Sequence, residues 1–347
     1  MKPIRVLIID DSPIVQLSLR RILSKEPDIE VMGVASDPFE AKDLMTEDKP
    51  DVITLDIEML RMDGITFLKR LMSYSPIPVV MISSYTRKNS IRTIEALEAG
   101  AVDFVTKPSY GTEIEFTSLR NEIVTKIRGA SEAQVKPIIL QRKALVKTRE
   151  TPDTIANKLI AIGASIGGPM AVQKLLCGIS FQPPGIVIAQ HMAAGYTQAF
   201  AQRLNDILPF DVREACDMDR VDQGEVLIIP GGRHMRVVRN EESYMIRLDK
   251  TSLTQDPSID VGRSINVLFH SVAKSAGPNA VGIILTGMGK DGVDGLAAMK
   301  GAGAYTIAQD EASCVVFGMP RVAIERGIVD AVASPEDIPA ILLTDVK

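Results

Sequence analysis

Short apolar runs recur along the first 130 residues, and the segments between them repeat apolar positions with the spacing of a helix. Ile91–Ala99 is one such helical segment, ended by Gly100, and Ser118–Arg128 is the last. Strands that alternate with helices indicate a parallel sheet with helices on both faces. The runs predicted to form its strands are Ile4–Asp10, Glu30–Ser36, Val52–Asp56, Val79–Ser83 and Asp103–Lys107.

The rest of the chain has the same alternation, with one interruption. Met235–Leu248 alternates polar and apolar residues around a polar centre, which predicts an antiparallel hairpin inserted at one sheet edge. The expected fold class is therefore α/β, with a flavodoxin-like (βα)5 first domain and a mostly parallel, doubly wound second domain carrying an antiparallel β-hairpin. The predicted parallel strands of the second domain are Leu159–Ala164, Gly185–Ala189, Val226–Ile229, Val281–Leu285 and Tyr305–Gln309.

Between the two patterns lies a basic segment without sustained periodicity. We expect residues 1–129 to form the first domain, residues 130–155 a linker, and residues 156–347 the second domain. The length of 347 residues suits two domains of ordinary size.

Charge and cysteine content narrow the possible functions. Residues 1–150 hold 22 basic and 22 acidic side chains, whereas residues 151–347 hold 17 and 22, so the second domain is acidic. An acidic second domain argues against nucleic acid as a partner. Three widely spaced cysteines predict neither a disulfide framework nor a thiolate zinc site. With no apolar span and no signal peptide, we expect a cytoplasmic protein that does not insert into membranes.

Polar side chains at the strand ends of the first domain form a candidate site. The carboxyl ends of parallel strands converge at one crevice, so Asp10, Asp11, Asp56, Ser83 and Lys107 are expected to meet there. This is the chemistry of a phospho-acceptor aspartate. Asp56 would accept the phosphoryl group, and the three aspartates would bind Mg²⁺. Lys107 and Ser83 would stabilise phosphoryl oxygens.

The first third of the chain resembles the receiver domain of two-component response regulators, because four separately placed elements agree. A histidine kinase is the expected phosphodonor. Ser12 is set apart from this site. Because Pro13 follows Ser12 and proline favours the first turn of a helix, we interpret Ser12 as the N-cap of a helix.

A second candidate site lies in Gly163–Gly168, where a strand turns into a helix and exposes Ser165. The pattern suits a nucleophile elbow, but equally a packing turn or a phosphate cradle. A dinucleotide site would need an acid after the next strand, whereas residues 154–205 contain no Asp or Glu. That strand instead ends at His191. A serine and a histidine at neighbouring strand ends indicate a nucleophile and its base.

The third member of such a site would be a carboxylate that orients the imidazole, and Asp291 is the best candidate. Taken alone, Asp291 fits better as a plain helix N-cap. His270 is expected to be a helix residue. His234 lies in a loop before the hairpin and could line a cleft. With three unclustered histidines, a metal site in the second domain is not expected.

Over nearly its full length the chain resembles the chemotaxis response-regulator protein-glutamate methylesterases. The resemblance implies Ser165, His191 and Asp291 as catalytic triad, with the Met288 region in the oxyanion hole. It implies methylated glutamates of methyl-accepting chemotaxis receptors as substrate, and glutamine deamidation as a related activity. The matching segments are Asp56–Met59, Gly163–Gly168, Gln190–Met192, Pro230–Met235, Val267–Phe269 and Thr286–Gly292.

Some positions depart from the family pattern. The family usually has threonine at Ile166, proline at Leu60 and Ala193, and aspartate at Asn266. None of these departures removes a member of the triad. They affect the support of the site, the rate and receptor specificity rather than the reaction class.

The leading hypothesis is ester hydrolysis by acyl transfer without a cofactor in the esterase step, with N–H groups near Ile166 and Met288 holding the oxyanion. The receiver would fold over the Ser165 cleft until phosphorylation releases it. Two alternatives stay open: a regulator that binds a protein without catalysis, and a hydrolase of small esters or amides. Labelling of Ser165 by a serine-reactive probe would argue against the first.

Overall fold

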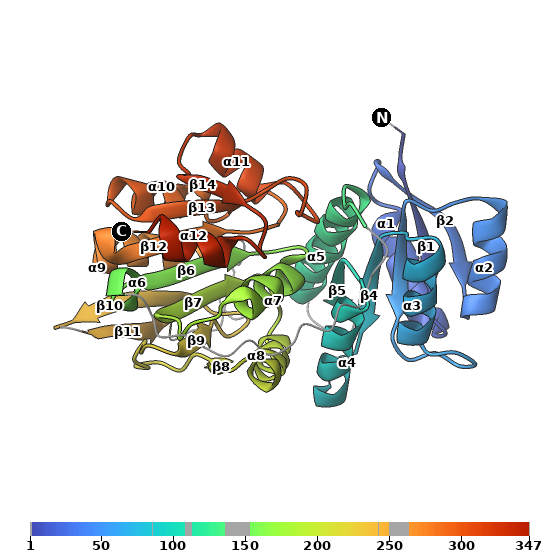
Figure 1. Cartoon of the computed structure of the whole chain (residues 1–347). Helices are drawn as coiled ribbons and strands as arrows, with labels where there is room; N and C mark the ends of the chain where they lie inside the picture. Colours follow the sequence, from blue (N-terminus) through green and yellow to red (C-terminus); the bar gives the residue numbers. More distant parts are fainter. Residues whose placement is uncertain are drawn as a thin grey trace. The chain divides into compact units, whose positions relative to one another are not determined.

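The computed structural model describes residues 2–84, 86–107, 113–135, 153–241, 243–249 and 264–346. The chain divides into two compact units, Met1–Gln141 and Arg142–Lys347. Much of the predicted linker, residues 136–152, lies outside the described residues. Figure 1 shows the helices and strands of both units, coloured along the sequence from the N-terminus to the C-terminus.

The first unit is a five-stranded parallel sheet with the strand order β2-β1-β3-β4-β5. This is the flavodoxin-like order, so the predicted fold class is confirmed for this unit. Its strands are β1 (Ile4–Ile9), β2 (Ile29–Ala35), β3 (Val52–Asp56), β4 (Val79–Ser83) and β5 (Asp103–Thr106). Its helices are α1 (Pro13–Leu23), α2 (Pro38–Glu47), α3 (Gly64–Tyr74), α4 (Arg87–Glu98) and α5 (Glu113–Ser131).

The interpretation of Ser12 as a helix cap is wrong in one respect. Ser12 occupies the N-cap position of α1, but its hydroxyl accepts no capping hydrogen bond. Its backbone N–H instead donates to Asp10 Oδ1 at 2.9 Å. Ser12 therefore helps to fix the first aspartate of the strand-end cluster, while Pro13 alone favours the helix start.

The second unit is built on a seven-stranded sheet with the order β14-β13-β12-β6-β7-β9-β8, in which every pair is parallel. The chain enters the sheet at the central strand β6, adds β7, β8 and β9 on one side, and then adds β12, β13 and β14 on the other. The predicted doubly wound class is therefore confirmed. Its strands are β6 (Leu159–Ala164), β7 (Gly185–Gln190), β8 (Asp211–Glu214), β9 (Glu225–Ile228), β12 (Ala280–Ile284), β13 (Tyr305–Gln309) and β14 (Ala331–Ala333).

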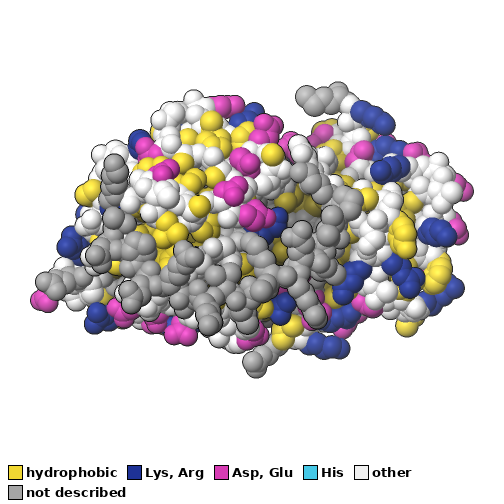
Figure 2. Space-filling model, in the orientation of Figure 1, with side chains coloured by type: hydrophobic (Ala, Val, Ile, Leu, Met, Phe, Trp, Pro, Cys, Tyr) yellow, Lys and Arg dark blue, Asp and Glu magenta, His cyan; other side chains and the backbone are white. Residues whose placement is uncertain are grey.

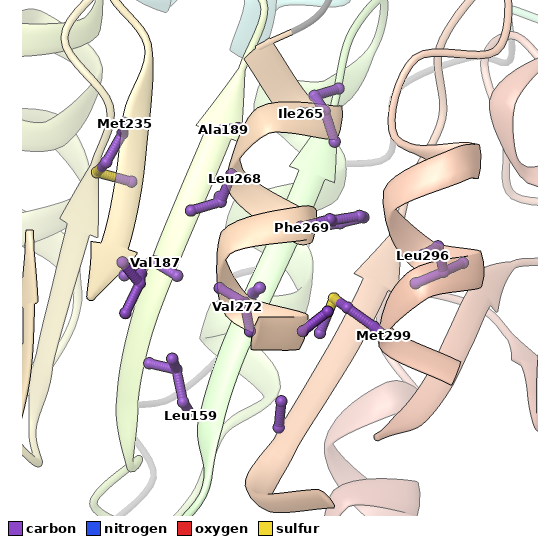
Figure 3. Close-up of a cluster of buried hydrophobic side chains, with 14 of the residues drawn as sticks. Leu159, Val187, Ala189, Met235, Ile265, Leu268, Phe269, Val272, Leu296 and Met299 are labelled. Atoms are coloured by element: carbon purple, nitrogen blue, oxygen red, sulfur yellow. The ribbon is translucent and has the colours of Figure 1, made fainter. Parts of the chain in front are cut away.

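Helices cover both faces of this sheet. Helices α9 and α10 pack on one face, where apolar side chains from the sheet, from both helices and from the hairpin form a common core (Figure 3). Figure 2 shows acidic side chains on the visible surface of this unit, in line with its composition. The helices are α6 (Asp153–Ala156), α7 (Gly168–Gly178), α8 (Tyr196–Ile207), α9 (Ser264–Ala276), α10 (Val293–Gly301), α11 (Met319–Glu325) and α12 (Ile338–Thr344), with a 3₁₀ turn at Gly277–Asn279.

The hairpin differs from its predicted place. Strands β10 (Met235–Asn240) and β11 (Ser243–Leu248) are antiparallel as expected, but they form a separate two-stranded sheet rather than an insertion at an edge of the main sheet. The reason is packing: buried side chains of the hairpin, including Met235 and Ile246, join the core that contains Leu268 of α9. The ribbon therefore covers α9 instead of extending the sheet.

Candidate functional sites

The predicted acceptor site of the first unit is assembled at the carboxyl ends of its strands. Asp56 is the last residue of β3, and Asp10 directly follows β1. Lys107 Nζ lies 2.7 Å from Asp56 Oδ2, as a hydrogen bond, and 3.1 Å from Asp10 Oδ2, as an ion pair. Asp56 and Asp10 are both buried, so the lysine is the cation that compensates two desolvated carboxylates.

The electrostatics of this cluster suit a divalent cation. Burial, the largest cause, raises the pKa of Asp56 to about 6, and the neighbouring Asp10 charge adds to the shift. Burial also raises the pKa of Asp10. Burial alone would lower the pKa of Lys107, but the ion pairs with Asp56 and Asp10 raise it above its usual value. Ligand oxygens of Asp10, Asp11 and Asp56 lie within 4.8 Å of one another, as a hard oxygen-preferring ion requires.

Ser83, the last residue of β4, is fully buried near this cluster. Its hydroxyl is hydrogen-bonded to Thr93 Oγ1 of α4 at 2.9 Å. Thr93 could not be singled out from the sequence, because a lone threonine within a helix carries no pattern. The Ser83 hydroxyl accepts the bond from Thr93, while its own proton is donated to Ser84 O at 3.4 Å.

In the second unit, Ser165 directly follows β6 at the carboxyl edge of the sheet. Its N–H donates to Thr286 O at 3.0 Å, and its carbonyl accepts from Gly168 N at 2.8 Å, which closes the turn into α7. Gly167 has a φ of +74°, a left-handed conformation that a side chain disfavours, and an added Cβ would lie 2.5 Å from Val315. The predicted strand-turn-helix context of the serine is present.

His191 directly follows β7, the neighbour of β6, and the register pairs Ala164 with Gln190. This register brings His191 Nδ1 to 3.1 Å from Ser165 Oγ. The other ring nitrogen, Nε2, lies 2.8 Å from Asp291 Oδ2. Because a carboxylate can only accept, Nε2 carries the proton and Nδ1 is free to accept the serine proton.

Asp291 has two structural roles at once. Besides His191, its carboxylate accepts from the backbone N–H groups of Ile265 and Asn266, each at 3.0 Å, at the start of α9. It also accepts from Gly292 N at 2.9 Å. The N-cap alternative is therefore partly correct, but the helix that Asp291 caps is α9 and not α10, the helix that it precedes. The N-terminus of α9 stabilises the negative charge that faces the imidazole.

Two backbone N–H groups, those of Ile166 and Met288, belong to the segments beside the serine. Within the described residues, neither Ile166 N nor Met288 N donates a hydrogen bond. The loop holding Met288 approaches Ser165 closely, since a Cβ added to Gly287 would lie 2.6 Å from the Ser165 Cβ. Free N–H groups beside a nucleophile are what an oxyanion hole requires. These contacts bring the predicted residues together, while their chemical roles stay predictions.

The other histidines and one buried amide complete the description. His270 is exposed on α9, as expected. His234 is buried, with Nδ1 3.4 Å from Asp249 Oδ2. In the sequence, Gln190 stands out only as the first residue of the matching segment Gln190–Met192, but in the structure its side chain is buried and donates to the carbonyls of Ser165 and His191. A polar residue at the end of an apolar strand is the feature of the sequence that could have indicated this contact.

A phospho-acceptor cluster and a serine–histidine–aspartate arrangement in one chain define a response regulator whose output unit is a hydrolase. A family model described as CheB methylesterase matches residues 160–342, and one described as response regulator receiver domain matches residues 6–116. The chain therefore belongs to the family of protein-glutamate methylesterases that carry a receiver domain.

Relatives with the same name extend over the whole chain. A protein-glutamate methylesterase/protein-glutamine glutaminase of Bordetella pertussis is 47% identical over 345 residues, covering 99% of this chain and 97% of the relative. One of Yersinia pestis bv. Antiqua is 45% identical over 348 residues, covering 100% and 98%. The crystal structure of the Thermotoga maritima CheB methylesterase catalytic domain is 34% identical and covers 54% of this chain and 97% of its own, with a TM-score of 0.49.

Proposed function

We propose that this chain hydrolyses methyl esters of glutamate side chains on chemotaxis receptors, and deamidates receptor glutamines, when its receiver is phosphorylated. The observation that carries the proposal is the continuous hydrogen-bonded path from Ser165 Oγ through His191 to Asp291. The full-length relatives, which are named for these two activities, support the substrate.

In the acylation step, Ser165 Oγ attacks the ester carbonyl carbon while its proton moves to His191 Nδ1. Asp291 holds Nε2–H and stabilises the imidazolium. The N–H groups of Ile166 and Met288 would donate to the oxyanion of the tetrahedral intermediate. When the intermediate collapses, the bond to the methoxy oxygen breaks. His191 returns the proton to that oxygen, so methanol leaves and a glutamyl ester of Ser165 remains.

In the deacylation step, water attacks the same carbonyl carbon and gives one proton to His191. The ester bond to Ser165 then breaks, the serine recovers that proton, and the glutamic acid side chain is released and loses its remaining proton to solvent. For a glutamine substrate, ammonia replaces methanol as the first product. Neither half of the cycle needs a cofactor.

In the receiver, we propose Asp56 as the acceptor of a phosphoryl group from a histidine kinase. Asp10, Asp11 and Asp56 would hold Mg²⁺, which when bound neutralises phosphoryl charge. Lys107 would pair with a phosphoryl oxygen, and Ser83 would donate a hydrogen bond to another. The close approach of Lys107 to two buried carboxylates supports this assignment.

The domain division also stays a proposal: residues 1–129 as receiver, 130–155 as linker and 156–347 as catalytic domain. The two compact units and the spans of the two family models are compatible with it. Among the described residues no helix is long and apolar enough to cross a lipid bilayer. We place the protein in the cytoplasm, where the methylated helices of the receptors lie.

Methanol release from methylated receptor membranes tests the esterase assignment. Ser165→Ala should reduce release to background, because no other nucleophile in the triad can form the acyl-enzyme. Ser275→Ala is the matched control, since the Ser275 hydroxyl donates to Val237 O at 2.9 Å, at the end of α9 that is remote from Asp291. Release by Ser165→Ala above a few per cent of wild type would refute the nucleophile.

A further inference from the structure

The buried amide of Gln190 holds the peptide group that carries one of the two free N–H groups beside Ser165. Gln190 is 3% exposed, and its Nε2 donates to Ser165 O at 2.9 Å and to His191 O at 3.1 Å. The orientation of the amide is set by these contacts, because both partners are carbonyl acceptors that only the NH₂ side can satisfy. Gln190 thus links the residues that follow β6 and β7.

The Ser165 carbonyl and the Ile166 N–H belong to the same peptide group. In a trans peptide these two groups point in opposite directions. Gln190 Nε2 and Gly168 N both hold the carbonyl on its side, so the Ile166 N–H is directed the other way and stays free. The second free N–H is held in the same manner: Met319 N donates to Gly287 O at 2.8 Å, which fixes the peptide carrying Met288 N–H.

The start of α7 leaves space beside Ser165 for the Gln190 amide. A Cβ added to Gly168 would lie 2.2 Å from Gln190 Oε1 and 2.8 Å from the Ala164 Cβ. The glycine at the start of α7 therefore allows Gln190 to reach the turn. Gln190 Oε1 is buried and accepts no hydrogen bond among the described residues. The side chain thus leaves a buried acceptor unsatisfied, while both Nε2 protons bond carbonyls at the nucleophile turn.

We propose that Gln190 is a positioning residue for the hydrolytic reaction, which keeps the Ser165–Ile166 peptide in the orientation that presents its N–H to the oxyanion. The inference rests on the proposed function of the second unit and adds a residue to it. If this peptide rotates, the carbonyl replaces the N–H at the oxyanion position, and one of two donors is lost. Removal of one such donor typically lowers kcat about 10²–10³-fold.

The effect should fall on kcat rather than KM, because the donor acts on charge that develops only in the transition state. Gln190→Glu puts a carboxylate oxygen in place of the donor and against the Ser165 carbonyl. We expect kcat to fall about 10²–10³-fold, with KM within about threefold of wild type. Gln190→Met removes the donor without adding a repelling oxygen, and the Gly168 contact remains. Its kcat should fall by about tenfold or more.

Gln309 provides a matched control for the same substitution. It is equally buried at the end of β13, where its Oε1 accepts from Thr286 N at 2.8 Å and its Nε2 donates to Ser313 Oγ at 3.1 Å rather than to the nucleophile turn. Gln309→Glu keeps that acceptor while it introduces the same buried carboxyl group. Both Gln→Glu variants should lose comparable thermal stability, and kcat of Gln309→Glu should stay within about threefold of wild type.

Full-length variants are compared by methanol release from methylated receptors and by the rate at which a phosphonate probe labels Ser165. The probe forms a tetrahedral adduct, so its labelling rate should fall in parallel with kcat, while labelling still reaches one probe per chain. Gln190→Met with kcat within threefold of wild type would overturn the proposal. So would an equal loss in Gln309→Glu, or unfolding of both Gln190 variants while Gln309→Glu folds.

The labelling assay separates this inference from the proposed function. If wild type is labelled at Ser165 but releases no methanol from receptors, the substrate is wrong. The ratio of labelling rates between Gln190 variants and wild type then still tests the role of Gln190.

Discussion

Replacing Asp291 by asparagine separates its role toward His191 from its role as a helix cap. The two carboxylate oxygens accept four hydrogen bonds: Oδ2 from His191 Nε2 and Ile265 N, and Oδ1 from Asn266 N and Gly292 N. An asparagine has one oxygen and one NH₂ group. In either orientation of the asparagine amide, two of the four N–H donors face its NH₂ group instead of an oxygen.

The stability cost follows from this count. A hydrogen bond to a charged group contributes about 1.5–3 kcal/mol. If the NH₂ group faces Asn266 N and Gly292 N, both bonds are lost and the free energy of unfolding should fall by about 3–6 kcal/mol; if it faces His191, the ring can change tautomer, only the Ile265 N bond is lost, and the decrease should be about 1.5–3 kcal/mol. If the NH₂ group faces His191, it donates to Nε2 and shifts the ring proton to Nδ1. The imidazole could then not accept the Ser165 proton. The same wrong-tautomer change in a serine protease lowers kcat by about 10⁴, or about 5.5 kcal/mol.

A second cap between the same helices is the control. The side-chain oxygen Oδ1 of Asn266 accepts from Gly295 N of α10 at 2.8 Å, whereas the contact of Asn266 with Asp291 is made by its backbone N–H, which an alanine keeps. Asn266→Ala should lower stability by about 1 kcal/mol and leave kcat within twofold. Stability is measured by denaturant unfolding, and kcat by methanol release from methylated receptors. An Asp291→Asn variant that is less stable but retains kcat within tenfold of wild type would show that Asp291 is only a cap.

Three further predictions concern the receiver. Because the pKa of Asp56 is raised to about 6, the folded receiver binds more protons than the unfolded chain between about pH 4 and 6. As pH rises from 4 to 7, the metal-free wild type should therefore lose about 3 kcal/mol of stability relative to Asp56→Asn. Calorimetry of both full-length proteins in the presence of a chelator measures this; a stability difference that does not change with pH would contradict the burial argument. Asp11→Asn should weaken Mg²⁺ binding about tenfold or more by titration calorimetry, and unchanged affinity would remove Asp11 from the ligands. A small-molecule phosphodonor should raise methanol release by the full-length chain but not by Asp56→Asn, and an equal response in both would place the acceptor elsewhere.

Most of the two sheets could be predicted from the sequence because their central strands are buried on both faces. Val52–Asp56, Val79–Ser83, Leu159–Ala164 and Tyr305–Gln309 are continuous apolar runs that form strands with the predicted bounds. The strands that were missed, β8 and β14, lie at the two edges of the second sheet. They are short and only partly buried, so they lack an apolar run to reveal them.

The sites were predictable to the extent that they depend on strand ends. Ser165 and His191 follow adjacent parallel strands, and this topology alone brings them together. The capping of α9 by Asp291 could not be predicted, because the helix start and its acceptor are 26 positions apart and belong to different loops. The contacts of Gln190 could not be predicted either, because the partners of a buried amide depend on the folded conformation of the turn.

The order of the strands has a consequence for the folding of the enzyme. Ser165 and His191 are 26 positions apart, and His191 and Asp291 are 100 positions apart, so the triad joins three strand ends that meet only through long-range pairing. Non-local pairing of this kind forms slowly and late in folding. A partly folded second unit should therefore contain Ser165 without its base. The rate at which a probe labels Ser165 during refolding would then measure how fast the central strands of the sheet pair.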